Sequence, residues 1–264
     1  MRPTSNTPST ALILSHPGHE LRVLGWLKTA RPLVLILTDG SGHTTQPRIE
    51  LSCELIEGAG GRLGSLCGNF TDQQFYQAIL NQDLDFFTQL RTRICDILAE
   101  QQIDLVVGDS IEGYNPSHDL CRSLIDSAVH DLQQTSGRTV QNYEFPLVDS
   151  PSAWSDREGA WCHALSQTEQ AWKLAQIRDY AQKVGGTLLV EVEEMLAQFG
   201  DGILGEEWFS PSISGHELNH FEETPPFYER HGARQVSAGY YDRAIEFRQH
   251  MLPLISALGR DDRA

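Results

Sequence analysis

The feature that most constrains the fold is a short apolar run that ends in a histidine-containing turn near the N-terminus. Residues 11–19 read Ala-Leu-Ile-Leu-Ser-His-Pro-Gly-His. Residues 20–27 then place apolar side chains at helical spacing, and Pro17 suits a first helical turn because its missing N–H costs nothing there. The sequence therefore predicts a buried strand, a polar turn that carries His16 and His19, and a helix.

The same order of buried strand, polar turn and helix recurs twice. Apolar runs at 33–37 and 103–107 lead into polar turns at 38–43 and 108–118. Strands that alternate with helices in this way form a parallel sheet covered by helices. We therefore predict an α/β fold, with a mostly parallel sheet and helices on both faces.

The remaining elements are predicted from apolar spacing and turn signals. We expect one domain over 1–264, with a core at 11–148 and a C-terminal elaboration at 149–264. Asp72 and Ser117 are candidate N-caps. Further strands are expected at 63–67 and 140–148. Helices are expected at 72–101 (one or two), from 117 onward, and at 167–183, 188–199 and 240–258. Irregular backbone is expected at 200–205 and 210–215.

Composition narrows the classes of partner. The chain has 264 residues and a formal net charge of −16, which argues against binding a nucleic-acid backbone. No apolar run reaches the ~20 residues of a membrane span, and residues 1–10 lack a signal-peptide pattern. The five cysteines contain no C-x-x-C pair, so we expect buried thiols in a reducing cytoplasm. The oligomeric state is left open.

Histidines follow the strands. His16 and His19 follow the first predicted strand, His43 follows the second, and His118 begins the helix after a later one. The carboxyl ends of parallel strands meet at one edge of a sheet, where ligands bind. Imidazole is the commonest metal ligand, so this edge is a candidate metal site. The alternative is a set of exposed polar turns.

The order of these motifs resembles the PIG-L/LmbE family of zinc-dependent N-deacetylases. The pattern comprises His-Pro-x-x-Glu at 16–20, Thr-Asp-Gly at 38–40, Arg-x-Glu at 48–50 and Asn-Pro-Ser-His at 115–118. The resemblance covers about 11–129 and, more loosely, 206–209. It implies a Rossmann-like fold, one Zn²⁺ per chain, and removal of an acetyl group from an N-acetylated sugar or sugar conjugate.

The resemblance also implies a ligand set for the metal. His16 and His118 match two family ligands, and His19 stands where the family has a ligand Asp. A hydrolytic zinc site needs three protein ligands and an open position, so the ligand count is preserved. His43 and Arg48 are candidates for binding the substrate.

Proton handling departs from the family pattern. Gly18 occupies the position of the general-base Asp, and Asn115 that of a histidine that assists the reaction. Glu20 and Asp109 are the carboxylates close enough in sequence to replace the base, although a structural role suits either one better. Asn115 can still donate a hydrogen bond to a developing oxyanion. The chain is therefore either an atypical hydrolase or a non-hydrolytic descendant that binds a sugar-like ligand.

Two further motifs lie in the C-terminal part of the sequence. His-Glu-Leu-Asn-His at 216–220 matches the H-E-x-x-H zinc motif, which requires a helix. Pro and Gly bound it closely, so we predict that it is not the metal site. The aromatic and charged residues at 226–232 and 239–241 are expected to pack on the core and can bound a sugar pocket.

Overall fold

The computed structural model describes residues 8–42, 46–185, 188–212, 218, 221 and 223–259. These residues contain a seven-stranded sheet with the order β3-β2-β1-β4-β5-β7-β6. β1 to β5 are parallel, whereas β7 and β6 are each antiparallel to their inner neighbour. The strands are β1 (Thr10–Leu14), β2 (Leu33–Thr38), β3 (Arg62–Phe70), β4 (Leu105–Asp109), β5 (Gln141–Phe145), β6 (Trp161–Ala164) and β7 (Glu206–Pro211).

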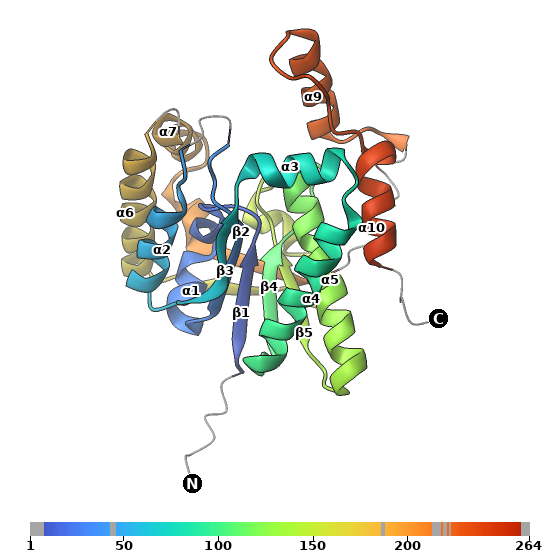
Figure 1. Ribbon diagram of the computed structural model, residues 1–264. Helices are drawn as coiled ribbons and strands as arrows, with labels where there is room; N and C mark the ends of the chain where they lie inside the picture. The colour runs from blue at the N-terminus through green and yellow to red at the C-terminus, as the bar shows by residue number, and fades with distance from the viewer. Residues whose placement is uncertain are drawn as a thin grey trace.

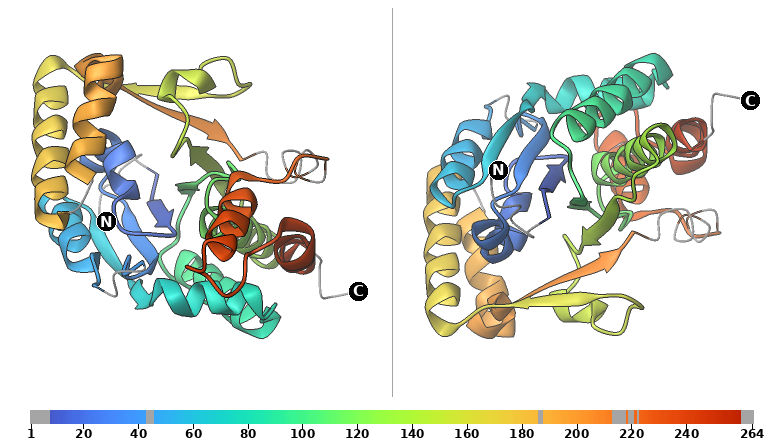
Figure 2. Two further views of the ribbon diagram at one scale, coloured as in Figure 1. Left: turned by 90° about the horizontal axis from the view of Figure 1, so that it is seen from above. Right: turned by 90° about the horizontal axis from the view of Figure 1, so that it is seen from below.

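Helices cover both faces of the sheet, as predicted (Figures 1 and 2). The α-helices are α1 (Leu24–Ala30), α2 (Ile49–Gly58), α3 (Asp72–Leu80), α4 (Leu84–Glu100), α5 (Pro116–Ser136), α6 (Gln167–Val184), α7 (Leu188–Phe199), α9 (Phe227–Ser237) and α10 (Leu252–Leu258). The short helical turns are η1 (His19–Val23), η2 (Pro151–Trp154), η3 (Asp201–Gly205) and the π-helical turn η4 (Phe247–Met251).

The central strands β1 and β2 are apolar except for Thr10 and Thr38 at their ends, as expected for strands buried on both faces. Every residue of β1 and β2 is buried. Ala11 and Ile13 pack with α3, α4, α5 and α10, whereas Leu12 and Leu14 pack with α1 and α2 on the opposite face. This arrangement follows from the alternation of side chains along a strand. The polar turns after β1, β2 and β4 consequently lie together at one edge of the sheet.

The predicted capping residues are wrong at two helices. The expected helix at 72–101 is two helices, and the first is capped by Thr71, whose hydroxyl accepts from Gln74 N at 3.1 Å. Helix α5 is capped by Asn115, whose Oδ1 accepts from Ser117 N at 3.0 Å. The side chains of Asp72 and Ser117 therefore do not cap these helices. Both point toward the edge of the sheet where the histidines lie.

The C-terminal part differs most from the predictions. The helix expected at 240–258 begins only at Phe247, and residues 206–211 form a strand. Residues 227–237, expected to mix turns with packed aromatics, form helix α9. The division between core and elaboration at 148/149 stays a prediction, although β6 and β7 extend the sheet itself.

A buried ion pair fastens this C-terminal part to the first helix. The Glu207 carboxylate accepts from the backbone N–H groups of Gly25 and Trp26 at 2.8 and 2.6 Å, in the first turn of α1. Lys173 Nζ, on α6, lies 2.6 Å from the same carboxylate. Both side chains are almost fully buried. Glu207 therefore satisfies helix N–H groups and a buried ammonium at once.

No helix in the described part of the chain is both long and apolar enough to cross a bilayer.

We predict that Lys173→Met destabilises the fold by about 3–5 kcal/mol, because it leaves the Glu207 carboxylate buried without its cation. Urea denaturation followed by circular dichroism measures the change. Lys183→Met is the control on the same helix, since Lys183 pairs with Asp179 in an exposed position and its loss should change stability little. Equal effects of the two substitutions would contradict the prediction.

Candidate functional site

Three imidazole rings meet at the carboxyl edge of the parallel strands. His16 follows β1, His19 begins η1, and His118 lies in the first turn of α5. Their ring centroids are 5.5 Å apart for His16 and His19, 5.3 Å for His16 and His118, and 4.4 Å for His19 and His118. The sheet therefore brings together the three histidines that the sequence marks as candidate ligands.

A buried carboxylate orients His19. Asp109, the last residue of β4, is 0% exposed, and both of its oxygens lie 3.0 Å from His19 Nδ1. Its Oδ2 also accepts from Ser15 N at 2.7 Å. Burial alone would raise the pKa of Asp109, but the charge and hydrogen bond of His19, together with Ser15, hold it below the usual value. Asp109 thus stays ionised and fixes the His19 ring.

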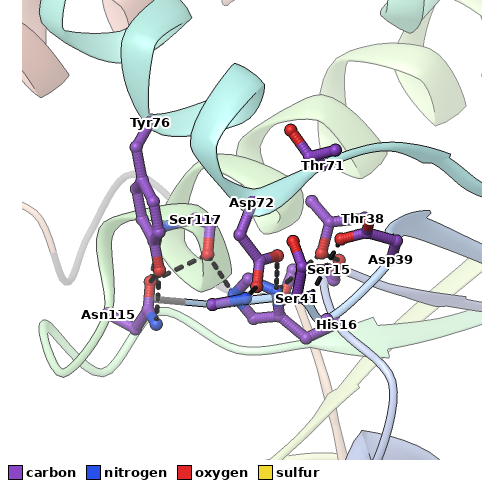
Figure 3. A network of polar contacts seen from close by, with 12 residues as sticks. Ser15, His16, Thr38, Asp39, Ser41, Thr71, Asp72, Tyr76, Asn115 and Ser117 are labelled. Carbon is purple, nitrogen blue, oxygen red and sulfur yellow. Dashed lines mark hydrogen bonds and ion pairs between the residues drawn. The ribbon is translucent and has the colours of Figure 1, made fainter. Parts of the chain in front are cut away.

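A second buried carboxylate orients His16 (Figure 3). His16 Nδ1 donates to Asp72 Oδ1 at 3.0 Å and lies 2.7 Å from Thr38 Oγ1. Asp72 Oδ2 accepts from Gly42 N at 2.6 Å. Burial opposes ionisation of Asp72, yet the hydrogen bond and charge of His16 keep the pKa of this carboxyl well below its ordinary value. The second imidazole is therefore also held by an anionic oxygen.

The chemistry of the donor set, three imidazoles with carboxylates behind two of them, suits a metal ion. A carboxylate on Nδ1 of His16 and of His19 leaves Nε2 as the lone-pair atom of each ring, the arrangement that carboxylates impose on histidine ligands. Burial, followed by the neighbouring charges of His19 and His16, lowers the pKa of His118 well below 6.5, so that ring is neutral at pH 7. The two anionic carboxylates behind the imidazole rings favour a bound cation.

The three rings are not arranged as a metal site. Within the residues that the structure describes, no group of three His, Cys, Asp or Glu side chains is arranged to hold a metal. The rings meet edge to face, at interplanar angles of 89°, 68° and 86°. The Ser117 hydroxyl lies 2.5 Å from His16 Nε2. Metal binding therefore requires this hydroxyl to turn away from His16.

Asn115 connects the histidines to a neighbouring cavity. Its Oδ1 accepts from the Ser117 hydroxyl at 2.8 Å, and its Nδ2 donates to Tyr76 Oη at 3.1 Å. Asn115 is half-buried and, with Tyr76 and Pro116, lines a cavity of about 800 Å³. The other two candidate catalytic residues, Glu20 and Asp109, are fully buried. A ligand in this cavity can reach Asn115 without rearrangement of the core.

Glu20 holds the turn that contains Gly18. Its Oε2 accepts from Gly18 N at 2.8 Å, and burial raises its pKa. Gly18 has φ +102°, a left-handed conformation that side chains rarely adopt. A Cβ built there lies 3.4 Å from Tyr180 Oη on α6. The Cα–Cβ bond of any side chain at position 18 would therefore point toward α6.

Of the two residues expected to bind substrate, Arg48 and His43, the structure describes only Arg48. Arg48 Nε donates to Gly40 O at 2.8 Å, which braces the turn after β2. Gly40 itself has φ +69°, and a Cβ there would lie 2.9 Å from the Pro17 ring, so close packing of the first two turns requires glycine. His43 lies outside the described residues, as do the two histidines of the motif at 216–220.

Solved structures of deacetylases share this architecture. A deacetylase triple mutant of the teicoplanin biosynthetic pathway aligns with a TM-score of 0.51 and 16% identity, covering 78% of this chain and 100% of that one. A deacetylase–teicoplanin complex gives 0.52 and 15%, covering 77% and 98%. An antimicrobial pseudoaglycone deacetylase gives 0.51 and 15%, covering 78% and 97%. The chain has the fold of these deacetylases. No protein-family model and no curated protein matches the sequence.

Sequence reasoning missed Asp72, Thr38 and Ser117 as parts of this site. Asp72 resembles a helix cap, and Thr38 belongs to the Thr-Asp-Gly motif without an assigned role. Thr38 is the last residue of β2, which neighbours β1, and Asp72 lies two residues after β3, the next strand out, so the signal was their position at the carboxyl ends of parallel strands. Ser117 lies between Asn115 and His118, two residues already marked as candidates.

We predict that Gly18→Asp fails to improve the site and destabilises the fold by about 1–2 kcal/mol, because a left-handed backbone is costly for a residue with a Cβ. The urea midpoint measures this change. Gly202→Asp is the control, since Gly202 lacks a positive φ and has open space around its Cβ position. A Gly18→Asp variant as stable as wild type would contradict the strain argument.

Proposed function

We propose that the protein is a metal-dependent N-deacetylase of the PIG-L/LmbE type that acts on an N-acetylated sugar or sugar conjugate. The observation that carries this proposal is the cluster of three imidazoles, two of them held by buried carboxylates, at the ligand-binding edge of a parallel sheet. The resemblance of the sequence motifs to that family supports it. The fold shared with deacetylases of glycopeptide biosynthesis supports it further.

His16, His19 and His118 are the residues that would hold the metal, and three nitrogen ligands suit zinc. When bound, zinc would supply a Lewis acid and a more acidic water for attack on the amide. Asp72 and Asp109 keep His16 and His19 in the tautomer that ligation requires. The chain therefore contributes the orientation of its ligands through carboxylates that are themselves immobile.

Asn115 is the proposed donor to the amide oxygen. Its Nδ2 faces Tyr76 Oη at the cavity wall, and its Oδ1 is fixed by its role in capping α5. A fixed amide donor stabilises negative charge that develops on a carbonyl oxygen. We therefore assign Asn115 a direct contact with substrate.

Proton transfer has no dedicated base at position 18. Asp109 is committed to His19 and Ser15, and Glu20 to the backbone of Gly18. Because both carboxylates are fully buried, we propose positioning roles for them. Loss of a general base typically costs about 10²–10⁴-fold in rate, so turnover should be slow relative to an enzyme that has one.

A non-hydrolytic sugar-binding protein is the alternative. The glycine at position 18 and the intramolecular hydrogen bonds at both ends of the Asn115 side chain favour it. Both proposals include the same cavity and the same imidazole cluster. Release of acetate separates them.

We also propose a cytoplasmic location. All five cysteines are free thiols, of which Cys121 is buried and the other four are partly buried, and Cys53 Sγ and Cys67 Sγ lie 3.5 Å apart in an S–H···S contact without a disulfide. Thiols so close together persist in a reducing compartment.

We predict that protein stripped with a chelator binds one equivalent of Zn²⁺ and that His118→Ala lowers the affinity at least about tenfold, since it removes one of three ligands. Isothermal titration calorimetry measures both quantities. The joint substitution of His216 and His220 by Ala tests the rival motif and should leave binding unchanged. Undiminished affinity in His118→Ala would overturn the ligand assignment.

We predict zinc-dependent release of acetate from N-acetylglucosamine or its conjugates. His16→Ala should abolish turnover, and Asp109→Asn should lower it by about 10–100-fold, because the amide no longer enforces one His19 tautomer. An enzymatic acetate assay on a panel of N-acetylated sugars measures the rates.

His130→Ala is the matched control for this assay, because His130 is exposed on α5, the helix that carries His118. It should retain the wild-type rate. Full zinc occupancy without any acetate release would favour the non-hydrolytic alternative.

A further inference from the structure

The cavity beside the imidazole cluster has walls from three separate parts of the chain. Helix α3 forms one wall, Tyr114 to Pro116 form a second, and α9 with residues 240–245 forms the third. In Figure 1, α9 lies beyond α3 at the end of the sheet where the parallel strands terminate. The cavity therefore extends the site outward from Asn115, into the region that the C-terminal part of the chain encloses.

Exposed aromatic side chains concentrate in this cavity. Tyr114 is 48% exposed, Phe227 37%, Tyr240 78% and Tyr241 47%, and all four line it. Among the described residues, these are the large aromatic side chains classed as exposed. Apolar surface left open to water in one contiguous place marks a binding site.

Two of these rings form a preorganised aromatic stack. Tyr114 and Phe227 stack with centroids 4.9 Å apart and planes 4° apart, and His231 stacks on Phe227 at 5.6 Å. A backbone hydrogen bond from Tyr228 N to Gly113 O, 3.2 Å long, joins the two segments that carry them. Aromatic side chains fixed in this way lose little entropy when a ligand packs against the parts of the rings that stay exposed.

The polar residues of the cavity indicate the chemistry of the ligand. Gln73 and Gln77, one turn apart on α3, present exposed amides to the same space. Aromatic faces attract the polarised C–H bonds of a pyranose ring, and amides donate to and accept from hydroxyl groups. An apolar aryl group could not form hydrogen bonds with these two amides. The combination favours carbohydrate.

We propose that this cavity binds the carbohydrate units that adjoin the acetamido sugar, so that the substrate is an oligosaccharide conjugate and not a monosaccharide. This inference rests on the proposed deacetylase function. The volume of about 800 Å³ lies toward the upper end of the range for pockets that hold drug-sized ligands, and it begins at Asn115. The reacting amide is then placed at the imidazole cluster while the rest of the glycan lies across the tyrosines.

Calorimetric titration of the full chain with N-acetylglucosamine, diacetylchitobiose and triacetylchitotriose tests the inference. Affinity should rise about tenfold from one sugar to three, because stacking on two rings contributes about that much. Tyr114→Ala and Tyr240→Ala should each remove about half of this increment in free energy, roughly threefold in affinity, whereas Tyr240→Phe should keep it. Val190→Ala, which shortens an exposed side chain on α7, is the control and should behave as wild type.

Equal affinity for the three saccharides, or an increment that survives both alanine variants, would overturn the inference. Tighter binding of an aryl N-acetylglucosaminide than of diacetylchitobiose would do the same and would assign the cavity to an aryl group. Absence of saccharide binding would also overturn it. Zinc-dependent acetate release from any member of the panel of N-acetylated sugars and conjugates tests the proposed function, whichever saccharide binds most tightly, so failure of one proposal is distinguishable from failure of the other.

Discussion

The arrangement of the site depends on the burial of one charged carboxylate. Asp109 is fully removed from water and keeps its charge only while His19 and Ser15 donate to it. Unpaired burial of such a charge would cost several kcal/mol, so the end of β4 cannot separate from the end of β1. Asp72 imposes the same condition on α3 through His16. The edge of the sheet and the orientation of the two rings are thus fixed by the same contacts.

The sequence was sufficient to predict the parallel strands, their order along the chain and the edge at which the histidines gather. Buried strands are continuous apolar runs, and the turns after them carry the polar residues, so both signals are local. Asp72 could not be assigned in this way. A carboxylate at the start of a helix is equally suited to capping, and only the packing of α3 beside β1 directs it toward His16.

The C-terminal third was harder to predict because tertiary contacts determine its structure. Residues 240–246 have helical composition but remain outside a helix, and the Glu229 carboxylate accepts from Phe247 N at 2.7 Å, where η4 begins. Strand β7 carries Glu207, which a local reading assigns to an exposed position, whereas Lys173 and α1 bury it. Such long-range partners are not visible in spacing or composition.

The turn that joins β4 to α5 contacts both the surroundings of the imidazole cluster and the aromatic wall of the cavity. Its Asn115 touches the residues around His16, and its Tyr114 stacks on Phe227 from a helix more than a hundred positions later. On the proposed function, reaction and recognition are consequently assigned to separate parts of the sequence, joined by one short loop. Substitutions in the segment around 227–245 can therefore change the walls of the cavity while the three histidines stay in place.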